Sequence, residues 1–203
     1  MKTLAIVGAS GHGKVVAEIA ELVGWQEVVF FDDAFPTVLS VGEWKVLGTT
    51  EDLVSQVDRY STAIVAIGDN SVRLKKSRYL CSKSLKLATL LHPGSIISKY
   101  ANVHSGSVVM AGAVINPFTS IGMASIINTG CSVDHDCMVG EGVHISPGVH
   151  VAGGVSIGDL SWLGIGSAVK HCVEIGSSVV VGAGAVVVNN IAPNLLVKGI
   201  PAK

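Results

Sequence analysis

The chain has 203 residues, of which 49% are hydrophobic and only 14% are charged, and its formal net charge is −1. A charge balance this close to zero provides no electrostatic footprint for nucleic acid or for an anionic lipid surface. No apolar run is long enough to span a bilayer, so we expect a chain that binds neither nucleic acid nor membrane.

Residues 1–90 predict an alternation of short strands and helices. Apolar runs at 3–7, 28–31 and 63–67 are typical of buried strands, and residues 85–90 predict a fourth strand. Residues 15–23 and 71–84 predict helices, and the segment 35–48 is rich in turn residues. This order indicates a small parallel sheet with helices on its faces, an α/β Rossmann-like arrangement.

The second predicted helix carries four basic side chains, which we expect to face solvent. They are Arg73, Lys75, Lys76 and Arg78.

A glycine-rich loop joins the first strand to the first helix. Gly8, Gly11 and Gly13 would let the backbone approach a phosphate at the helix N-terminus, where free N–H groups point outward. The spacing differs from the dinucleotide fingerprint, and the region is about half of a full dinucleotide fold, so we do not expect NAD. A nucleotide or nucleotide sugar fits better, and a tight strand–helix turn without a ligand is the alternative. His12 could reach such a ligand or could cap its own helix.

Polar residues also follow the second and third predicted strands. Asp32 and Asp33 come after one strand, and Gly68, Asp69 and Asn70 come after the other. Ligands of open α/β sheets bind beyond the carboxyl ends of the strands, which places these residues on the same side as the glycine loop.

From residue 91 the sequence repeats every six residues. The repeated positions are aliphatic without exception: Leu91, Ile97, Val103, Val109, Ile115, Ile121, Ile127, Val133, Val139, Ile145, Val151, Ile157, Leu163, Val169, Ile175, Val181 and Val187. Four residues after each of them comes a second inward candidate that is small or β-branched in nearly every repeat. A period of six fits neither a helix nor a plain strand, and a fixed short period is typical of a solenoid.

Three such repeats would close one triangular coil, in which short strands pack aliphatic side chains inward and glycines make corners. The sequence therefore predicts two domains, residues 1–90 and a β-helix at 91–203, with an irregular tail from 193. Cys131 and Cys137 fall at small inward positions, which predicts buried free thiols and a cytosolic chain. Few charges on the repeat also suggest that partner chains cover some outer faces.

His135 stands out among the histidines of the repeat because its surroundings are dense in polar residues. A neutral imidazole accepts protons near neutral pH, and an adjacent carboxylate could fix its tautomer. In a straight strand His135 and Asp136 would point to opposite faces. They can cooperate only across a corner, unless Asp134 is the partner, and an exposed corner histidine without a function is the alternative. No spacing of His and Cys indicates a metal site.

Several motifs together resemble one family, the bacterial sugar O- and N-acyltransferases of the PglD and NeuD type. The motifs lie at residues 8–13 (GASGHG), 31–33 (FDD), 66–70 (AIGDN), 128–130 (NTG), 133–141 (VDHDCMVGE) and 197–203 (VKGIPAK). The resemblance covers essentially the whole chain. It implies that the β-helix is left-handed and that the chain forms a homotrimer with acetyl-CoA between adjacent prisms.

The resemblance also implies roles for individual residues. His135 becomes the general base and Asp136 the residue that orients it, where family members commonly have Glu. His144 and the backbone of Ile165 and Ala183 would lie along the acetyl-CoA groove. The residues implied on the nucleotide-sugar side are Ser10, Gly11, His12, Asp32, Asp33 and Gly68.

We therefore expect an acetyl-CoA-dependent N-acetyltransferase acting on the 4-amino group of a nucleotide-linked amino-dideoxy sugar, without a metal. Two alternatives remain open from the sequence. One is O-acetylation of sialic acid or a similar sugar, and the other is a non-catalytic, nucleotide-binding trimeric scaffold.

Overall fold

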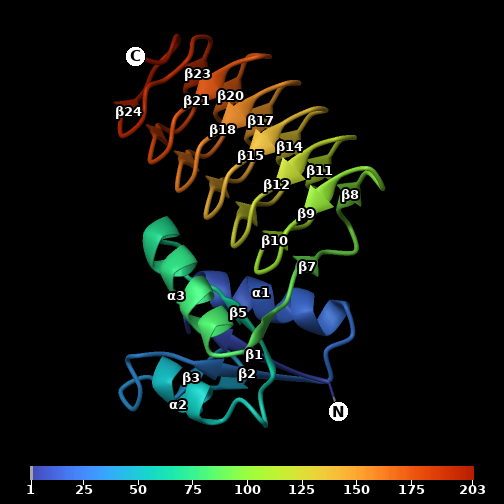
Figure 1. Ribbon diagram of the computed structural model, residues 1–203, viewed down its shortest axis with the longest axis vertical. Helices are drawn as coiled ribbons and strands as arrows, with labels where there is room; N and C mark the ends of the chain where they lie inside the picture. The colour runs from blue at the N-terminus through green and yellow to red at the C-terminus, as the bar shows by residue number, and fades with distance from the viewer. Residues whose placement is uncertain (1) are drawn as a thin grey trace. The chain divides into compact units, whose positions relative to one another are not determined.

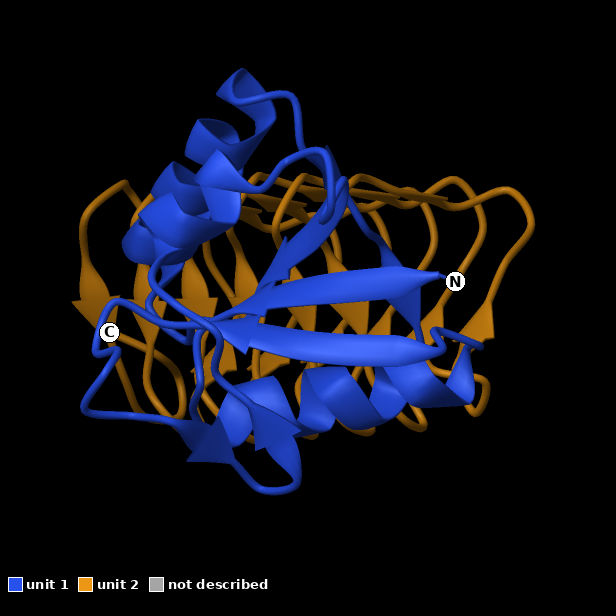
Figure 2. Ribbon diagram, turned by 90° about the horizontal axis from the view of Figure 1, so that it is seen from below, with its two compact units in different colours: residues 1–91 blue, residues 92–203 orange. Residues whose placement is uncertain are grey.

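The computed structural model describes residues 2–203. It divides into two compact units, one ending at Leu91 and the other running from His92 to Lys203 (Figure 2). No helix within residues 2–203 combines the length and the apolar character needed to cross a bilayer.

The N-terminal unit is built on a parallel sheet with helices on both faces (Figure 2). Its strands are β1 (Thr3–Val7), β2 (Glu27–Phe31), β5 (Thr62–Val65) and β6 (Lys86–Leu87), in the order β2-β1-β5-β6. β1 is central and its residues from Leu4 onward are buried, which is why this segment reads as a continuous apolar run. The strands predicted at 3–7, 28–31 and 63–67 are confirmed within one or two residues.

Two helices were predicted, and both are present with shifted bounds. α1 (Gly11–Leu22) begins inside the glycine loop, four residues before the predicted start, and α3 is Asn70–Ser82. A third helix, α2 (Thr50–Ser55), was not predicted, although Thr49 and Asp52 form a reciprocal cap at its start. The turn-rich segment contains a short hairpin of β3 (Ser40–Val41) and β4 (Trp44–Lys45).

The expectation that all four basic residues of α3 face solvent is wrong. Lys75 and Arg78 are exposed, but Lys76 is only partly exposed and Arg73 is buried, with 1% of its surface accessible. The reason is that Arg73 finds polar partners inside the unit, which replace water around its guanidinium.

The C-terminal unit is a prism of three parallel sheets, wound from short strands (Figure 1). Strands pair with a register of 18 residues, such as Val108 with Ile126, so each coil contains three hexads. The first face contains β10 (Val108–Val109), β13 (Ile126–Ile127), β16 (His144–Ile145), β19 (Trp162–Leu163), β22 (Val180–Val181) and β24 (Leu196–Val197). The second face contains β8 (Ile96–Ile97), β11 (Val114–Ile115), β14 (Ser132–Val133), β17 (His150–Val151), β20 (Ala168–Val169) and β23 (Val186–Val187). The third face contains β9 (Asn102–Val103), β12 (Ser120–Ile121), β15 (Met138–Val139), β18 (Ser156–Ile157) and β21 (Glu174–Ile175).

The hexad positions fill the prism as the repeat predicts. Every one from Val109 to Val187 is buried, and Cys131 and Cys137 are fully buried free thiols. The earliest positions are less well covered, since Leu91 is 39% exposed. The tail is more regular than expected, because β24 pairs with β22.

Successive coils turn at three edges. The edge between the first and second faces carries a left-handed glycine in five successive coils, and we call it the glycine edge: Gly112, Gly130, Gly148, Gly166 and Gly184. The edge between the second and third faces carries side chains at the equivalent corner positions in all but one coil, and we call it the histidine edge. Its corner pairs are Lys99-Tyr100, Pro117-Phe118, His135-Asp136, Gly153-Gly154 and His171-Cys172.

Candidate active site

His135 and Asp136 meet at the histidine edge. The second-face strand β14 ends at Val133 and the third-face strand β15 begins at Met138, so both residues lie in the corner. Asp136 adopts the left-handed conformation, with φ of 57°. This turn brings neighbouring side chains together instead of alternating them, and the Nδ1 atom of His135 lies 2.7 Å from Oδ2 of Asp136. The two residues thus straddle a corner, the arrangement that cooperation requires.

Asp134 has a different task at this corner. Its Oδ1 accepts hydrogen bonds from the backbone N–H of His135 at 2.9 Å and from Nδ2 of Asn116, one coil earlier, at 2.8 Å. These two bonds lower the pKa of Asp134. Asp134 therefore fixes the backbone of the corner, while Asp136 is the carboxylate that contacts the imidazole.

The electrostatics of the corner favour a protonated His135. The hydrogen bond that Nδ1 of His135 donates to Asp136 is the main cause of the raised pKa of His135, and the negative charge of Asp134 adds to it. The imidazole is 59% exposed. Because Nδ1 donates to Asp136 in the neutral tautomer, Nε2 carries the free lone pair and is the atom that can accept a proton.

Gly153, one coil after His135, leaves room for this imidazole. A Cβ atom built on Gly153 would lie 2.7 Å from both Cε1 and Nε2 of His135. Any side chain there would displace the ring. The hexad pattern did not single out Gly153, yet the 18-residue register marks it, because 153 is one coil beyond 135.

The residues expected along an acetyl-CoA groove lie elsewhere on the prism. His144 is on the first face, where its ring stacks on Trp162 with centroids 5.7 Å apart and its Nε2 lies 3.1 Å from Nδ2 of Asn128. Ile165 and Ala183 are exposed at the glycine edge. One prism therefore brings His135 together with Asp136 but not with Ile165 or Ala183, which occupy a different edge.

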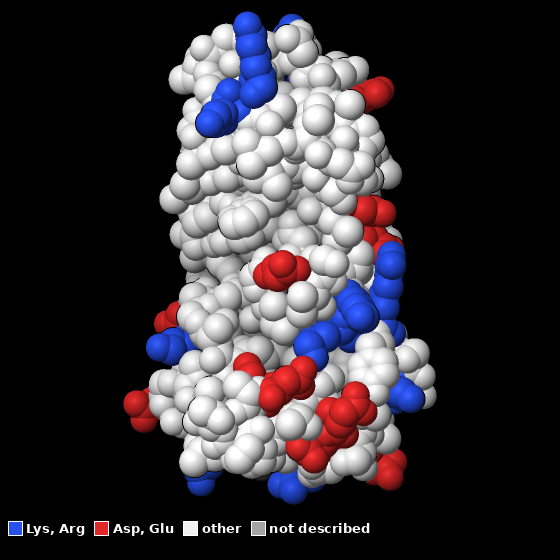
Figure 3. All heavy atoms as spheres, turned by 90° about the vertical axis from the view of Figure 1, so that its left-hand side faces the viewer, with Lys and Arg blue, Asp and Glu red and all other residues white. Residues whose placement is uncertain are grey.

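The third face, which begins at the histidine edge, carries a shallow apolar groove of about 730 Å³. Met138, Ile157, Ile175 and Pro193 line it, and Met138 is 58% exposed. On the face drawn in Figure 3, large areas of the prism carry no Lys, Arg, Asp or Glu. No group of three or more His, Cys, Asp or Glu side chains in the described part of the chain is arranged to hold a metal ion.

In the N-terminal unit, two of the three loop glycines are required by packing. A Cβ on Gly8 would lie 2.8 Å from the carbonyl oxygen of Ala66, and one on Gly13 would collide with the carbonyl oxygen of Gly8. Gly11 has open space around it, so packing alone does not explain it. Ser10 precedes α1, and its hydroxyl makes no capping hydrogen bond.

His12 is largely buried beside this loop. Its Nε2 atom is inaccessible and has no hydrogen-bond partner among residues 2–203. Burial, followed by the charge of Arg73, lowers the pKa of His12 to about 4, so the ring is neutral at physiological pH. A buried nitrogen without a partner is a costly feature that a bound ligand would relieve.

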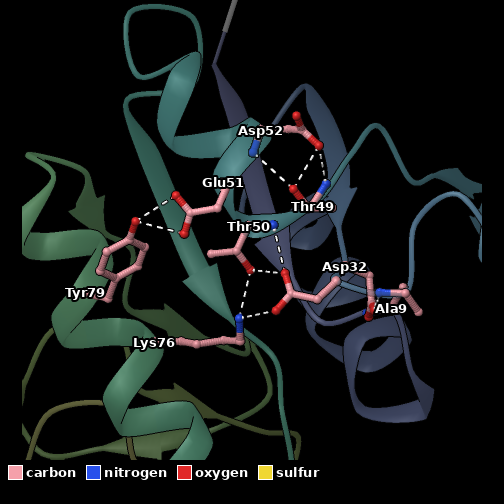
Figure 4. A network of polar contacts seen from close by, with 10 residues as sticks. Ala9, Asp32, Thr49, Thr50, Glu51, Asp52, Lys76 and Tyr79 are labelled. Atoms are coloured by element: carbon pink, nitrogen blue, oxygen red, sulfur yellow. Dashed lines mark hydrogen bonds and ion pairs between the residues drawn. The ribbon is translucent and has the colours of Figure 1, made fainter.

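Asp32 and Asp33 are both engaged in hydrogen bonds. Oδ2 of Asp32 accepts the N–H of Ala9 at 2.7 Å, which ties the glycine loop to the end of β2 (Figure 4). Asp33 accepts hydrogen bonds from Lys76, at 2.6 Å, and from the hydroxyl and N–H of Thr50. Burial raises the pKa of Asp33, but these hydrogen bonds outweigh it and lower the pKa to about 2.

Arg73 is a residue of this region that the sequence did not reveal. Its Nη1 donates to the carbonyl oxygens of Ile67 and Gly68, at 2.9 and 3.0 Å, and so fixes the loop after β5. Burial lowers the pKa of Arg73 to about 10, which leaves it charged. Nothing in the sequence of a helix with several basic residues distinguishes the one that turns inward.

Comparison with known proteins decides the family. Residues 3–80 match the family model described as the PglD N-terminal domain. The acetyltransferase domain of PglB from Neisseria gonorrhoeae, solved with acetyl coenzyme A, is 41% identical and superposes with a TM-score of 0.95 over 100% of this chain and 98% of that one. The chain belongs to the PglD-type sugar acetyltransferase family.

Two further relatives are described with different nucleotide-linked sugars. A variant of perosamine N-acetyltransferase from Caulobacter crescentus, in complex with CoA and GDP-perosamine, is 37% identical with a TM-score of 0.94, over 99% of this chain and 95% of that one. UDP-N-acetylbacillosamine N-acetyltransferase of Bacillus subtilis is 35% identical over 117 residues, which is 55% of this chain and 52% of that protein. The match thus spans about half the length of this curated relative. These members of the family act on different nucleotide-linked amino sugars.

Proposed function

We propose that the chain is an acetyl-CoA-dependent N-acetyltransferase that acts on the 4-amino group of a nucleotide-linked amino-dideoxy sugar. The observation that carries the proposal is the contact of 2.7 Å between Nδ1 of His135 and Asp136 at an exposed corner. An imidazole held by a carboxylate on one nitrogen and open on the other is arranged to accept a proton. The bound ligands of two similar structures, acetyl coenzyme A in one and CoA with GDP-perosamine in the other, support the substrate pair.

The reaction needs one proton acceptor and no covalent enzyme intermediate. The amine nitrogen of the sugar attacks the thioester carbonyl, and the new N–C bond forms while Nε2 of His135 takes the amine proton. The tetrahedral intermediate then collapses, the C–S bond breaks, and coenzyme A leaves as a thiolate, which the protonated His135 can neutralise. Asp136 stabilises the imidazolium formed in the first step.

The nucleotide end of the sugar belongs, in this proposal, to the glycine loop and its surroundings. Gly11 offers free backbone at the start of a helix of 12 residues, where the unpaired N–H groups favour a phosphate. Ser10 has an uncommitted hydroxyl, and His12 has a buried nitrogen that lacks a partner. Asp32, Asp33 and Gly68 would contribute mainly by holding this loop and the one after β5 in shape.

We propose that the complete site forms between copies of the chain, in a homotrimer. His135 is at the histidine edge, whereas Ile165 and Ala183, expected beside acetyl-CoA, are at the glycine edge of the same prism. Two copies packed side by side would bring unlike edges together, as a rotational oligomer does. Sparse charge and an apolar groove on the prism favour such packing.

Subunit complementation tests the shared site. His135→Ala removes the base from the histidine edge, and Ile165→Glu disrupts the glycine edge, so each variant alone should be nearly inactive. A mixture of the two, denatured and refolded together, should regain up to about a quarter of wild-type activity, because one interface in four would combine two intact edges. If the mixture stays inactive while mixed trimers are shown to form, both residues serve the same protomer or Ile165 has no role.

The activity itself is tested by thiol release from acetyl-CoA. The panel contains nucleotide-linked 4-amino sugars with different bases, the same sugars with a 4-hydroxyl, sialic acid, and no acceptor. Rapid turnover with an amino sugar, and a product with an N-linked acetyl group by mass spectrometry, is the expected result. Turnover with hydroxyl acceptors alone would favour O-acetylation, and turnover with none would favour a non-catalytic scaffold.

A further inference from the structure

Two aromatic rings lie exposed on the histidine edge, in the coils just before His135. Tyr100 and Phe118 stack with centroids 5.6 Å apart, yet 55% of Tyr100 and 65% of Phe118 remain accessible. The ammonium of Lys99 lies 4.9 Å from the centre of the Tyr100 ring. Neither ring belongs to the prism core, so packing does not account for them.

These residues form a continuous ladder with the His135–Asp136 pair. The N–H of Asp136 donates to the carbonyl oxygen of Pro117 at 3.1 Å, and the N–H of Phe118 donates to that of Tyr100 at 3.2 Å. Adjacent parallel strands lie roughly 4.8 Å apart, so the Lys99-Tyr100 corner is about 10 Å from the His135-Asp136 corner. We call residues 99–100, 117–118 and 135–136 the corner strip.

Phe118 occupies its place at a cost. Its φ is 63°, the left-handed conformation that bulky side chains rarely adopt. Glycine satisfies the same geometry at the equivalent corners of the glycine edge, as at Gly112 and Gly130. The backbone of Phe118 is strained, and its large apolar ring is exposed next to a proton-accepting pair. This combination indicates that the ring contacts a ligand.

We propose that the corner strip binds the sugar and its anomeric phosphate, with the rings of Tyr100 and Phe118 against the apolar face of the pyranose. This inference rests on the proposed function and deepens it. The order along the strip is a cation, an aromatic platform and a proton acceptor. The order along a nucleotide-linked 4-amino sugar is an anionic phosphate on C1, a ring, and an amine on C4 at the far end.

The platform should also select the sugar. An aromatic face is apolar and gains contact from C–H bonds and from a methyl group, whereas a hydroxymethyl group would lose part of its hydration there. The strip therefore favours a sugar that is deoxygenated at C6. Lys99 would attract the phosphate next to the sugar whatever base the nucleotide carries, so the strip reads the sugar and not the base.

Phe118→Gly removes the ring without creating strain, because glycine adopts this φ freely. We expect kcat/KM for the nucleotide amino sugar to fall about tenfold, with KM for acetyl-CoA unchanged. Phe118→Tyr should retain the wild-type value. The matched control is Leu160→Gly, a change at φ of 62° on the third edge, which should leave both parameters unchanged.

Selectivity gives a second readout that a structural role would not move. Wild type should prefer a 6-methyl sugar over its 6-hydroxymethyl analogue on the same nucleotide, and Phe118→Gly should lose most of that preference. Lys99→Gln should raise KM for the nucleotide sugar and weaken its dependence on salt.

Three outcomes overturn the inference. If wild type acetylates many nucleotide amino sugars and Phe118→Gly matches it in rate and selectivity, the inference alone fails. If Phe118→Gly instead changes the oligomeric state by sedimentation, the rings are a contact between copies. If wild type acetylates no nucleotide amino sugar, the proposed function fails and the inference with it.

Discussion

The glycine edge and the histidine edge of the prism solve the same geometric problem with different residues. From residue 112 onward both turn the chain through a left-handed residue in successive coils. On the glycine edge that residue is always glycine between Gly112 and Gly184, with φ between 64° and 69°. On the histidine edge it is Phe118, Asp136 and Cys172 in three coils, with φ of 63°, 57° and 56°.

The difference shows at which corners the prism carries a residue other than glycine in a conformation that glycine adopts with the least strain. A left-handed conformation costs an ordinary residue about 1–2 kcal/mol, and glycine avoids most of that cost. The third edge also has non-glycine residues in this conformation, among them Ala124, which is fully buried. Left-handed backbone alone therefore does not identify a site. Among the described left-handed residues, an exposed carboxylate or aromatic ring occurs at Phe118 and Asp136, and both lie on the histidine edge.

The largest effect should come from removing the imidazole. His135→Ala should lower kcat by about 10²–10⁴, the usual contribution of a general base. Thiol release by the purified variant measures this, with circular dichroism to confirm that the prism is intact. A near-wild-type rate would show that His135 is not the general base.

Asp136→Asn should have a smaller effect, about 10–100-fold, because the base remains and only its support changes. The pH profile is the sharper readout. A base must be neutral, so activity falls as pH drops through its pKa, and the hydrogen bond that His135 donates to Asp136 raises the pKa of His135 above its usual value. Losing that bond should move the acidic limb of kcat/KM to lower pH. An unmoved limb would mean that Asp136 does not raise the pKa of the base. A larger loss of activity than in His135→Ala would mean that the roles of the two residues are reversed.

Gly153→Ala tests whether the imidazole of His135 needs the space that Gly153 leaves beside it. The new Cβ would lie 2.7 Å from Nε2 of His135, and the ring should rotate away because it is the end of a flexible side chain. We expect kcat to fall about tenfold with little change in thermal stability. The matched control is Gly154→Ala, at φ of 69°, which should lower stability and spare most of the activity. Equal rates in the two variants would contradict the argument.

Most of the prism could be predicted from the sequence, because its packing repeats. A side chain that must point inward every six residues leaves the same signature in every coil, and the core from Val109 to Val187 follows it. His135 was singled out from the sequence because polar residues cluster around it, whereas most of the repeat is aliphatic or small. The contact between His135 and Asp136 could not be predicted in the same way. It depends on the left-handed conformation of Asp136, and a non-glycine residue gives no sign of that conformation in the sequence.

The N-terminal unit was harder to read because its decisive contacts are individual. Arg73 turns inward to two carbonyl oxygens, whereas its helix neighbours Lys75 and Arg78 stay in solvent. Helix α2 is only six residues long, too short to show a period, although its cap at Thr49 and Asp52 was a usable signal. Such contacts depend on tertiary neighbours that no local pattern encodes.

The smallest expected effect is on thermal stability, and it compares one corner residue from each edge. Gly112→Ala places a side chain at φ of 69° on the glycine edge, where its only close neighbours would be backbone atoms of Gly130 at 3.7 Å and beyond. Space is therefore sufficient, and the cost is the backbone strain of about 1 kcal/mol, which corresponds to a thermal midpoint lower by about 2–4 °C. Asp136→Gly makes the opposite change at the same conformation, so it should lower the midpoint by less than Gly112→Ala, although it removes the carboxylate that supports His135. A large loss of stability in Asp136→Gly would show that Asp136 is kept for the fold, and the contrast between the two edges would then be structural instead of catalytic.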